Sequence, residues 1–285
     1  MKRLSIEKKK KIEGLILVSP FIIGVLLFFV YPLFTTIRLS FGEMNQVSGF
    51  NVEWAGFKNY VQIITVDHNF IPMFLEVIQN VFTQVPLVIV FSLIMAILVN
   101  KDIKGRGFFR AAFFMPFLLG SGIVFEQIVA MGAVNQFLTV ESIGISQETI
   151  ASLGTQAVTL VNTFFQVITT VLWHTGVQTL LFLSALQGIS ISLYESAKVD
   201  GANSWETFWK ITLPMVKPIM LVNIIYTLCD SFTDISNPII EYTQQRAFQD
   251  QKFPEAAAIG VLYLLFVLIL VMLVFLILGR RSRND

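Results

Sequence analysis

The sequence has few charged residues and a single cysteine. Only 14% of its 285 residues are charged, whereas 55% are hydrophobic, and the formal net charge is +1. A soluble domain of this size needs a more polar surface, so this composition is typical of a polytopic membrane protein. The lone Cys229 excludes an intrachain disulfide and a cysteine metal cluster, and we expect it to serve helix packing.

Motifs that carry catalysis are also missing. No Gly-x-x-x-x-Gly-Lys-Ser/Thr occurs, so the chain has no phosphate-binding loop of its own. The two histidines, His68 and His174, stand apart in the sequence, and no HExxH or membrane-embedded Ser-His pair accompanies them. We therefore expect no enzymatic activity, no metal site and no cofactor bound by this chain.

Long apolar runs dominate what is present. Each is near or above the ~20 residues that cross a bilayer as a helix. They cover residues 15–37, 77–99, 111–133, 157–186, 217–240 and 256–279. The first is not a cleavable signal peptide, because it is long, contains Pro20 and Pro32, and lacks a small-residue cleavage site. The prediction is an all-α polytopic membrane protein with six transmembrane helices after a basic arm, residues 1–14.

The basic residues are distributed unevenly over the connections. All but four of the 20 lysines and arginines lie in the N-terminal arm, the second and fourth connections and the tail. The four on the other side are Arg38, Lys58, Arg246 and Lys252. The positive-inside rule therefore places both termini and the 187–217 loop in the cytoplasm. Segment 38–76 is then external, and we expect it to form a small ordered cap.

The polar loop at 187–217 contains two possible helix starts. Ser192 and Glu195 fit a capping box, and Asn203 with Glu206 fits a second, weaker one with asparagine as the cap. Gly201 lies between them, where a left-handed residue would end the first helix. The prediction is a short helix, a glycine turn and a second short helix.

The end of this loop is marked by proline. Pro214 and Pro218 are expected to limit continuation of the helix into the fifth span. Ala197 and Ala202 are small enough for a partner backbone to approach closely. Three apolar side chains are expected to anchor the loop beneath the spans: Phe208, Ile211 and Leu213. On physical grounds alone, an ordinary amphipathic interfacial loop explains this pattern equally well.

The residues of this loop resemble the EAA loop of binding-protein-dependent ABC importer permeases. That loop has Glu-Ala-Ala, then Asp-Gly-Ala three residues later, and an Ile-x-Leu-Pro ending. The matching positions are Glu195, Ala197, Asp200, Gly201, Ala202, Phe208, Ile211, Leu213 and Pro214, with Ser196 in place of the usual alanine. Segments 183–189, 105–116 and 56–60 are also similar to maltose-type sugar permeases.

This resemblance implies a fold, a function and a set of partners. Residues 15–285 would form one transmembrane domain of the type I ABC importer permease fold in a bacterial cytoplasmic membrane. The chain would carry a sugar or oligosaccharide by alternating access. Its EAA loop would seat in an ATPase subunit that holds ATP and Mg. The implied partners are a second homologous permease, two cytoplasmic ATPase subunits, an extracytoplasmic solute-binding protein and membrane lipid; nucleic acid is not among them.

A polar stripe in the fifth span is the candidate substrate pathway. Its members are separated by three or four residues and therefore share one helix face. They are Asn223, Tyr226, Asp230, Asp234 and Asn237. Carboxylates within a bilayer face a bundle interior or a wet cavity, and these donors and acceptors suit sugar hydroxyls. The alternatives are contacts to a partner permease or to other spans, or attraction of a cationic solute such as a polyamine.

Two residues of the fourth span add to the candidate pathway. Trp173 could stack on a sugar ring, whereas His174, taken alone, is more typical of helix packing. By resemblance to maltose-type permeases, the sugar-lining positions are Phe117 and Ser121, Trp173 and His174, and Ser231 and Asp234. Ser231 lies off the stripe derived from periodicity, and that conflict stays open.

Two other functions remain as alternatives. One is a permease of the same superfamily for a non-sugar solute, such as a polyamine or glycerol phosphate. The other is a secondary transporter, for which inverted repeats or an ion relay in the membrane would be typical, and neither is found. The sequence leaves open which solute is carried and whether the partner permease is a second copy.

Overall fold

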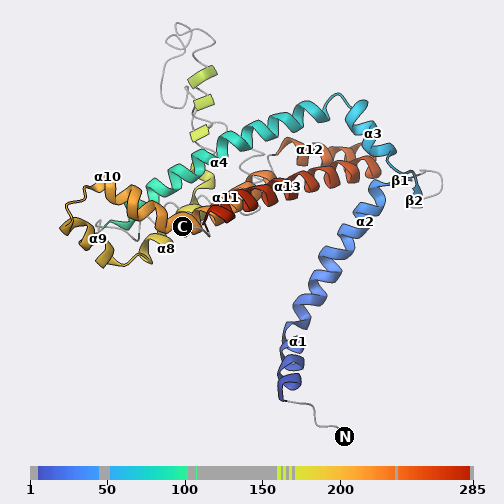
Figure 1. Cartoon of the computed structure of the whole chain (residues 1–285). Coiled ribbons are helices and arrows are strands. Elements are labelled where there is room, and N and C mark those ends of the chain that lie inside the picture. Colours follow the sequence, from blue (N-terminus) through green and yellow to red (C-terminus); the bar gives the residue numbers. More distant parts are fainter. Residues whose placement is uncertain are drawn as a thin grey trace. The chain divides into compact units, whose positions relative to one another are not determined.

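The structure is a computed structural model that describes residues 6–44, 52–101, 107, 159–161, 163–164, 167–168, 171–234 and 237–282. In this part of the chain the regular structure is helical apart from one short β-hairpin (Figure 1). The chain forms two compact units. The first comprises residues 1–77 and 234–268, and the second residues 78–233 and 269–285. The predicted third span, with Phe117 and Ser121, lies outside the described residues.

Several described helices are long and apolar enough to cross a membrane. They are Glu13–Ser40, Phe70–Asn100, Ser204–Gln249 and Phe253–Gly279. A fifth crossing is added if α8 (Gly176–Gln187) and α9 (Ile191–Val199), which meet at 65°, count as one bent span. The chain is thus a multi-pass membrane protein.

The first span is one continuous helical run. It consists of α1 (Ile6–Val25), the π-helical turn η1 (Leu26–Val30) and α2 (Tyr31–Ser40). The wide turn ends two residues before Pro32, and the Tyr31 N–H bonds to the Leu26 carbonyl, five residues back. A proline ring clashes with the carbonyl four residues before it, so a locally wider helix accommodates the ring without ending the span.

A small β-hairpin follows the first span and was not predicted from the sequence. Strand β1 (Gly42–Met44) pairs antiparallel with β2 (Val52–Trp54), with Gly42 opposite Trp54. A Cβ atom at Gly42 would collide with the Val52 side chain, so glycine is required for this close pairing. The Phe41 ring stacks on Trp54 at 5.4 Å.

Helix α3 (Lys58–Thr65) ties the hairpin to the end of the first span. The Tyr60 and Ser40 hydroxyls are 2.6 Å apart in a buried hydrogen bond. The buried Asn59 amide donates to the carbonyls of Ser40 and Gly42, at 2.9 and 2.8 Å. Because these carbonyls lie where α2 ends and the hairpin begins, one side chain replaces the backbone partners that both have lost.

The second unit contains most of α4 (Phe70–Asn100), α8 and α9. It also contains α10 (Ser204–Thr207), the π-helical turn η2 (Phe208–Thr212) and α11 (Leu213–Thr233). Helices α8 and α11 pack on one another, and fully buried side chains such as Phe182, Val216 and Phe232 form the core of this unit.

The predicted fifth span is interrupted near its end. Helix α11 ends at Thr233, and α12 (Pro238–Gln244) continues into η3 (Gln245–Gln249) before α13 (Phe253–Ser282). Asn237 is extended, with φ −70° and ψ 120°, because the residue before a proline avoids the helical region. The Asn237-Pro238 pair is a turn signal that the apolar pattern concealed.

Candidate functional site

The tip of the 187–217 loop is a tight helix stop. Gly201 is left-handed, with φ +79°. Its N–H donates to the Lys198 carbonyl at 3.1 Å, and the Ala202 N–H donates to the Ala197 carbonyl at 2.9 Å. This pair of bonds is the Schellman pattern, which closes the last turn of α9. The predicted glycine turn is therefore confirmed.

The two predicted helix starts have different outcomes. The capping box at Asn203 is confirmed, since its side chain accepts from the Glu206 N–H at 2.9 Å and Glu206 accepts from the Asn203 N–H at 3.1 Å. The capping box of Ser192 with Glu195 is wrong, because α9 begins at Ile191 and its N-cap is Ser190. The Ser190 and Ser192 hydroxyls bond to each other at 2.7 Å instead.

The predicted proline break is also wrong. A helical run continues from Ser204 through η2 and α11 to Thr233, with Pro214 and Pro218 inside it. The Leu213 N–H bonds to the Phe208 carbonyl, five residues back, one position before Pro214. The same widening precedes Pro32 in the first span, and here too it accommodates the ring.

The residues that match the EAA pattern divide into an exposed and an inner set. Glu195, Ser196, Asp200 and Gly201 are exposed at the tip, and Pro214, in the first turn of α11, is exposed as well. Phe208, Ile211 and Leu213 are half-buried, which fits their expected anchoring role, and Ala202 is also half-buried. Ala197 is buried within the chain, so its small size serves internal packing and leaves no surface there for a partner backbone.

Further contacts hold the loop to the base of α11. The Tyr194 hydroxyl lies 3.1 Å from the Thr212 hydroxyl and so connects α9 to η2. Trp205 and Trp209 meet edge to face at 5.5 Å and keep 69% and 49% of their surface exposed. The sequence prediction missed this pair, although its spacing of four residues signals one helix face.

A polar seam joins α8 to α11. The buried Gln178 amide donates to the Thr227 hydroxyl at 3.2 Å, and the Asn223 amide donates to the Gln178 carbonyl at 3.2 Å. The Thr227 hydroxyl in turn donates to the Asn223 carbonyl at 2.8 Å. Asn223, predicted as a pathway residue, thus binds a neighbouring helix with its amide, while its buried side-chain oxygen has no hydrogen-bond partner among the described residues.

His174 and Asp230 extend this seam toward the end of α11. The His174 Nδ1 lies 2.7 Å from Asp230 Oδ2, with exposed side-chain fractions of 16% and 34%. A hydrogen bond from His174 to a carboxylate requires a proton on Nδ1, because a carboxylate oxygen accepts and does not donate. The histidine therefore contacts a candidate pathway residue directly, which its sequence position alone did not reveal.

The remaining predicted pathway residues occupy different surroundings. Tyr226 and Trp173 are half-buried. Ser231 is buried, and no residue in the described part of the chain bonds to its hydroxyl. The continuous stripe is wrong beyond Asp230, because Asp234 follows the end of α11 and Asn237 caps α12. The buried Asn237 amide donates to the Tyr263 hydroxyl at 2.7 Å, within the first unit.

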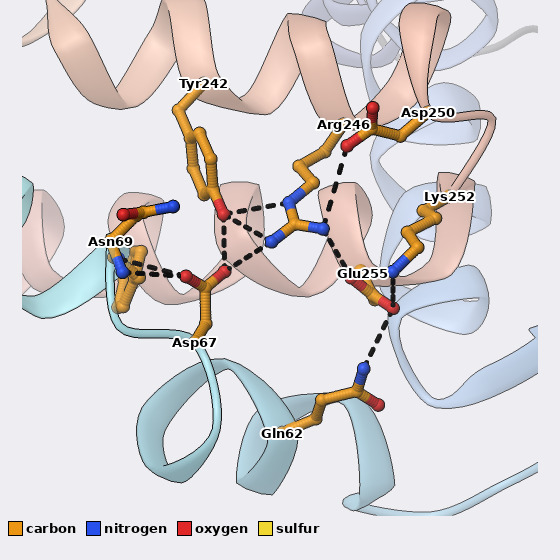
Figure 2. A network of polar contacts seen from close by, with 9 residues as sticks. Gln62, Asp67, Asn69, Tyr242, Arg246, Asp250, Lys252 and Glu255 are labelled. Carbon is orange, nitrogen blue, oxygen red and sulfur yellow. Dashed lines mark hydrogen bonds and ion pairs between the residues drawn. The ribbon is translucent and has the colours of Figure 1, made fainter.

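A second polar cluster, missed by the sequence prediction, lies in the first unit (Figure 2). Asp67 accepts from the Asn69 and Phe70 N–H groups with one oxygen, at 2.9 and 3.3 Å, and so caps the start of α4. Its other oxygen accepts from the Tyr242 hydroxyl at 2.5 Å and from Arg246 at 2.9 Å. We call these residues the Asp67 clasp.

Arg246 extends the Asp67 clasp to the start of α13. Its guanidinium lies 3.6 Å from Asp250 and 3.5 Å from Glu255. Glu255 also pairs with Lys252 at 3.2 Å and accepts from Gln62 at 3.1 Å. Two segments distant in sequence, residues 62–70 and 242–255, are thereby joined (Figure 2).

The clasp lowers the pKa of Asp67. Burial raises the pKa of this carboxyl, but the hydrogen bonds from Tyr242 and Asn69 and the charge of Arg246 outweigh burial. The pKa therefore lies below its ordinary value of 3.8. A carboxyl with a lowered folded pKa stabilises the protein above its unfolded pKa, and this stabilisation disappears as the pH falls through the folded pKa.

Asp67→Asn is expected to destabilise the protein by about 2–3 kcal/mol at neutral pH, because one amide oxygen replaces a carboxylate on which four donors converge. Thermal unfolding in detergent between about pH 3 and 7 measures this, and the variant should lose less stability on acidification than the wild type. The control is Glu43→Gln, whose ion pair with Lys58 is well exposed and contributes less than about 1 kcal/mol. Equal losses in the two variants would contradict a special role of the clasp.

Comparison with known families gives a match over most of the chain. The model of a family described as binding-protein-dependent transport system inner membrane component matches residues 65–284. The probable ABC transporter permease protein YesP of Bacillus subtilis is 31% identical over 237 residues, which are 81% of this chain and 74% of the relative. The lactose transport system permease protein LacF of Rhizobium radiobacter is 31% identical over 229 residues, or 77% and 72%.

One relative matches nearly the whole chain, and a solved structure shares its fold. The arabinooligosaccharides transport system permease protein AraP of Halalkalibacterium halodurans is 26% identical over 302 residues, covering 97% of this chain and 90% of the relative. A chain of a bacterial alginate ABC transporter, solved in complex with an alginate pentasaccharide-bound periplasmic protein, superimposes with a TM-score of 0.70. It covers 99% of both chains at 18% identity and shows the shared fold.

Proposed function

Because the chain belongs to the family of binding-protein-dependent transport system inner membrane components, we propose that it is the permease subunit of an ATP-driven importer for a sugar or oligosaccharide. Relatives named for lactose and arabinooligosaccharides support this substrate class. They favour it over a polyamine or glycerol phosphate. The chain itself makes and breaks no covalent bond in this proposal.

The exposed loop tip is the proposed coupling element. Glu195, Asp200 and Gly201 are exposed around the Schellman turn. Tyr194, through its bond to Thr212, and the buried Ala197 attach the loop to the rest of the second unit. The tip offers a partner cleft two carboxylates and the apolar Val199, which is 88% exposed. An ATPase subunit with a basic and apolar cleft would fit this surface. This tip is the observation that carries the coupling role.

The partners and the orientation complete the proposal. Two cytoplasmic ATPase subunits would hold ATP and Mg, since no phosphate-binding loop occurs in this sequence. A second permease would complete the pathway, and a solute-binding protein would deliver the sugar from outside. The distribution of lysine and arginine supports cytoplasmic termini and a cytoplasmic loop in a bacterial cell membrane.

The proposed sugar pathway lies along the α8–α11 seam and the residues before it. Trp173, His174, Tyr226 and Asp230 are each only half-buried within this chain, so part of each surface remains for a substrate. An indole ring, a phenol and a carboxylate supply the stacking face and hydrogen-bonding groups that a sugar ring uses.

Trp173→Ala is expected to raise the KM for sugar uptake about fivefold, because the variant loses an aromatic stacking face worth about 1 kcal/mol. The measurement is ATP-driven uptake of labelled oligosaccharides into vesicles that contain the full complex. Phe275→Ala serves as the control, since this aromatic side chain on α13 is 56% exposed and lies outside the seam. Unchanged kinetics in the Trp173 variant would remove this residue from the pathway.

A further inference from the structure

A shallow groove lies beside the end of the first span, within the first unit. It measures about 660 Å³, in the range of small-molecule sites. Its apolar lining comes from Leu39, Met44, Val52 and Phe253, so α2, the hairpin and the first residue of α13 all contribute. Two charged side chains, Arg38 and Glu53, also line it.

Arg38 differs from the other basic residues assigned to this end of the spans. The other basic residues assigned to this side are all paired, Lys58 with Glu43 at 2.9 Å, Arg246 with Asp67 at 2.9 Å and Lys252 with Glu255 at 3.2 Å. Within the described part of the chain, the side chains of Arg38 and Glu53 form neither an ion pair with each other nor a hydrogen bond with another residue. The groove thus combines one positive and one negative side chain, both available to a ligand, with an apolar lining.

The groove lies at the end of a membrane span, where lipid headgroups surround the protein. Arg38 lies in the last turn of α2, two residues before the end of the span Glu13–Ser40. The apolar window of this span has no buried residue within the chain, and side chains such as Phe34 and Ile37 are exposed next to Arg38 in sequence. A charged side chain at the end of such a span lies at the level of lipid headgroups.

We propose that this groove binds the headgroup of phosphatidylethanolamine, with the lipid phosphate on Arg38 and its primary ammonium on Glu53. The phosphate matches the planar donor array of a guanidinium, and the ammonium donates hydrogen bonds to a carboxylate. The glycerol backbone and upper acyl chains contact the apolar lining. This inference requires only that the chain lies in a membrane, so it is independent of the transported solute and of the coupling loop.

The test is lipid binding to the full-length protein in detergent, measured by native mass spectrometry as lipids are titrated. Phosphatidylethanolamine should bind several-fold more tightly than phosphatidylglycerol, which has the phosphate but no ammonium. Its affinity should also be higher than that of phosphatidylcholine, whose quaternary ammonium donates no hydrogen bond. Equal affinity for all three lipids would overturn the proposal.

Two variants test which lipid group each charged side chain contacts. Arg38→Gln should weaken phosphatidylethanolamine binding about tenfold or more, through loss of the charge-assisted bonds to phosphate. Glu53→Gln should lower the affinity for phosphatidylethanolamine to that for phosphatidylglycerol and leave phosphatidylglycerol binding unchanged. An equal loss for both lipids in Glu53→Gln would contradict a contact with the ammonium.

Controls separate recognition from general charge and folding effects. Lys58→Gln removes a basic side chain at the same end that is already paired with Glu43, and lipid selectivity should remain unchanged. If Arg38→Gln fails to fold, Arg38→Lys keeps the charge but loses the planar donor array, and a several-fold weakening is expected. Displacement of the lipid by millimolar inorganic phosphate would overturn the lipid assignment in favour of a free anion.

Discussion

Gly201→Asp should abolish ATP-driven uptake while the protein still folds and inserts. Gly201 is exposed at the loop tip, and a Cβ there meets no atom within 4 Å. Its left-handed backbone costs a side chain about 1–2 kcal/mol, and aspartate tolerates this conformation better than most residues. A third carboxylate beside Glu195 and Asp200 would, however, have to lose water when the tip enters a partner cleft.

The matched control separates charge from backbone strain. Gly201→Asn has nearly the same size and the same tolerance of a left-handed backbone, but no charge. We expect the asparagine variant to keep a substantial part of the uptake and the aspartate variant to lose more than tenfold, with equal amounts of both in the membrane. ATP-driven uptake in vesicles and co-purification of the ATPase subunits measure the effect. Normal uptake by the Gly201→Asp variant would contradict docking at this tip.

Loss of the His174–Asp230 contact should have the second large effect. Asp230→Ala removes the acceptor that lies 2.7 Å from His174 Nδ1 and so breaks the contact between α11 and the segment before α8. Uptake should fall about tenfold, and the double variant His174→Ala with Asp230→Ala should be no slower than the slower single variant, because the two residues act together. Cys229→Ser, an exposed neighbour on α11, is the matched control and should show wild-type uptake.

The kinetic pattern distinguishes positioning from direct substrate contact. If the pair positions the helices, Asp230→Asn should retain most of the uptake, since its amide oxygen still accepts from Nδ1–H. If Asp230 also binds the sugar, the same variant should raise KM with little change in kcat. Additive losses in the double variant would show that the two residues act independently.

The sequence predicted local features whose cause lies within a few residues. Gly201 and the capping box of Asn203 with Glu206 were identified because a left-handed turn and an N-cap depend on residues three positions apart or fewer. The predicted helix break at Pro214 was wrong, because a proline ends a helix only where the preceding turn cannot widen, and η2 does widen. The break at Asn237 was missed because apolar periodicity continued across it.

Contacts across long sequence distances could not be predicted from periodicity. Helical spacing placed Asp230 on a face, but the partner of its carboxylate, His174, is 56 residues away. The Asp67 clasp joins residues separated by 175 and 179 positions, and a single sequence carries no signal for such pairs. The loop pair Trp205 and Trp209 differs from these contacts, because its spacing of four residues was a local signal that the sequence prediction did not use.

The uninterrupted helix from Ser204 to Thr233 has a mechanical consequence. At a rise of 1.5 Å per residue, the step from Trp205 to Asp230 measures about 40 Å, more than the thickness of the hydrocarbon core. One continuous helical run therefore has aromatic side chains of the loop near one end and the carboxylate bonded to His174 near the other. The loop tryptophans and the candidate pathway are thus parts of the same secondary-structure element, so a displacement of the loop acts directly on the helix that carries Asp230.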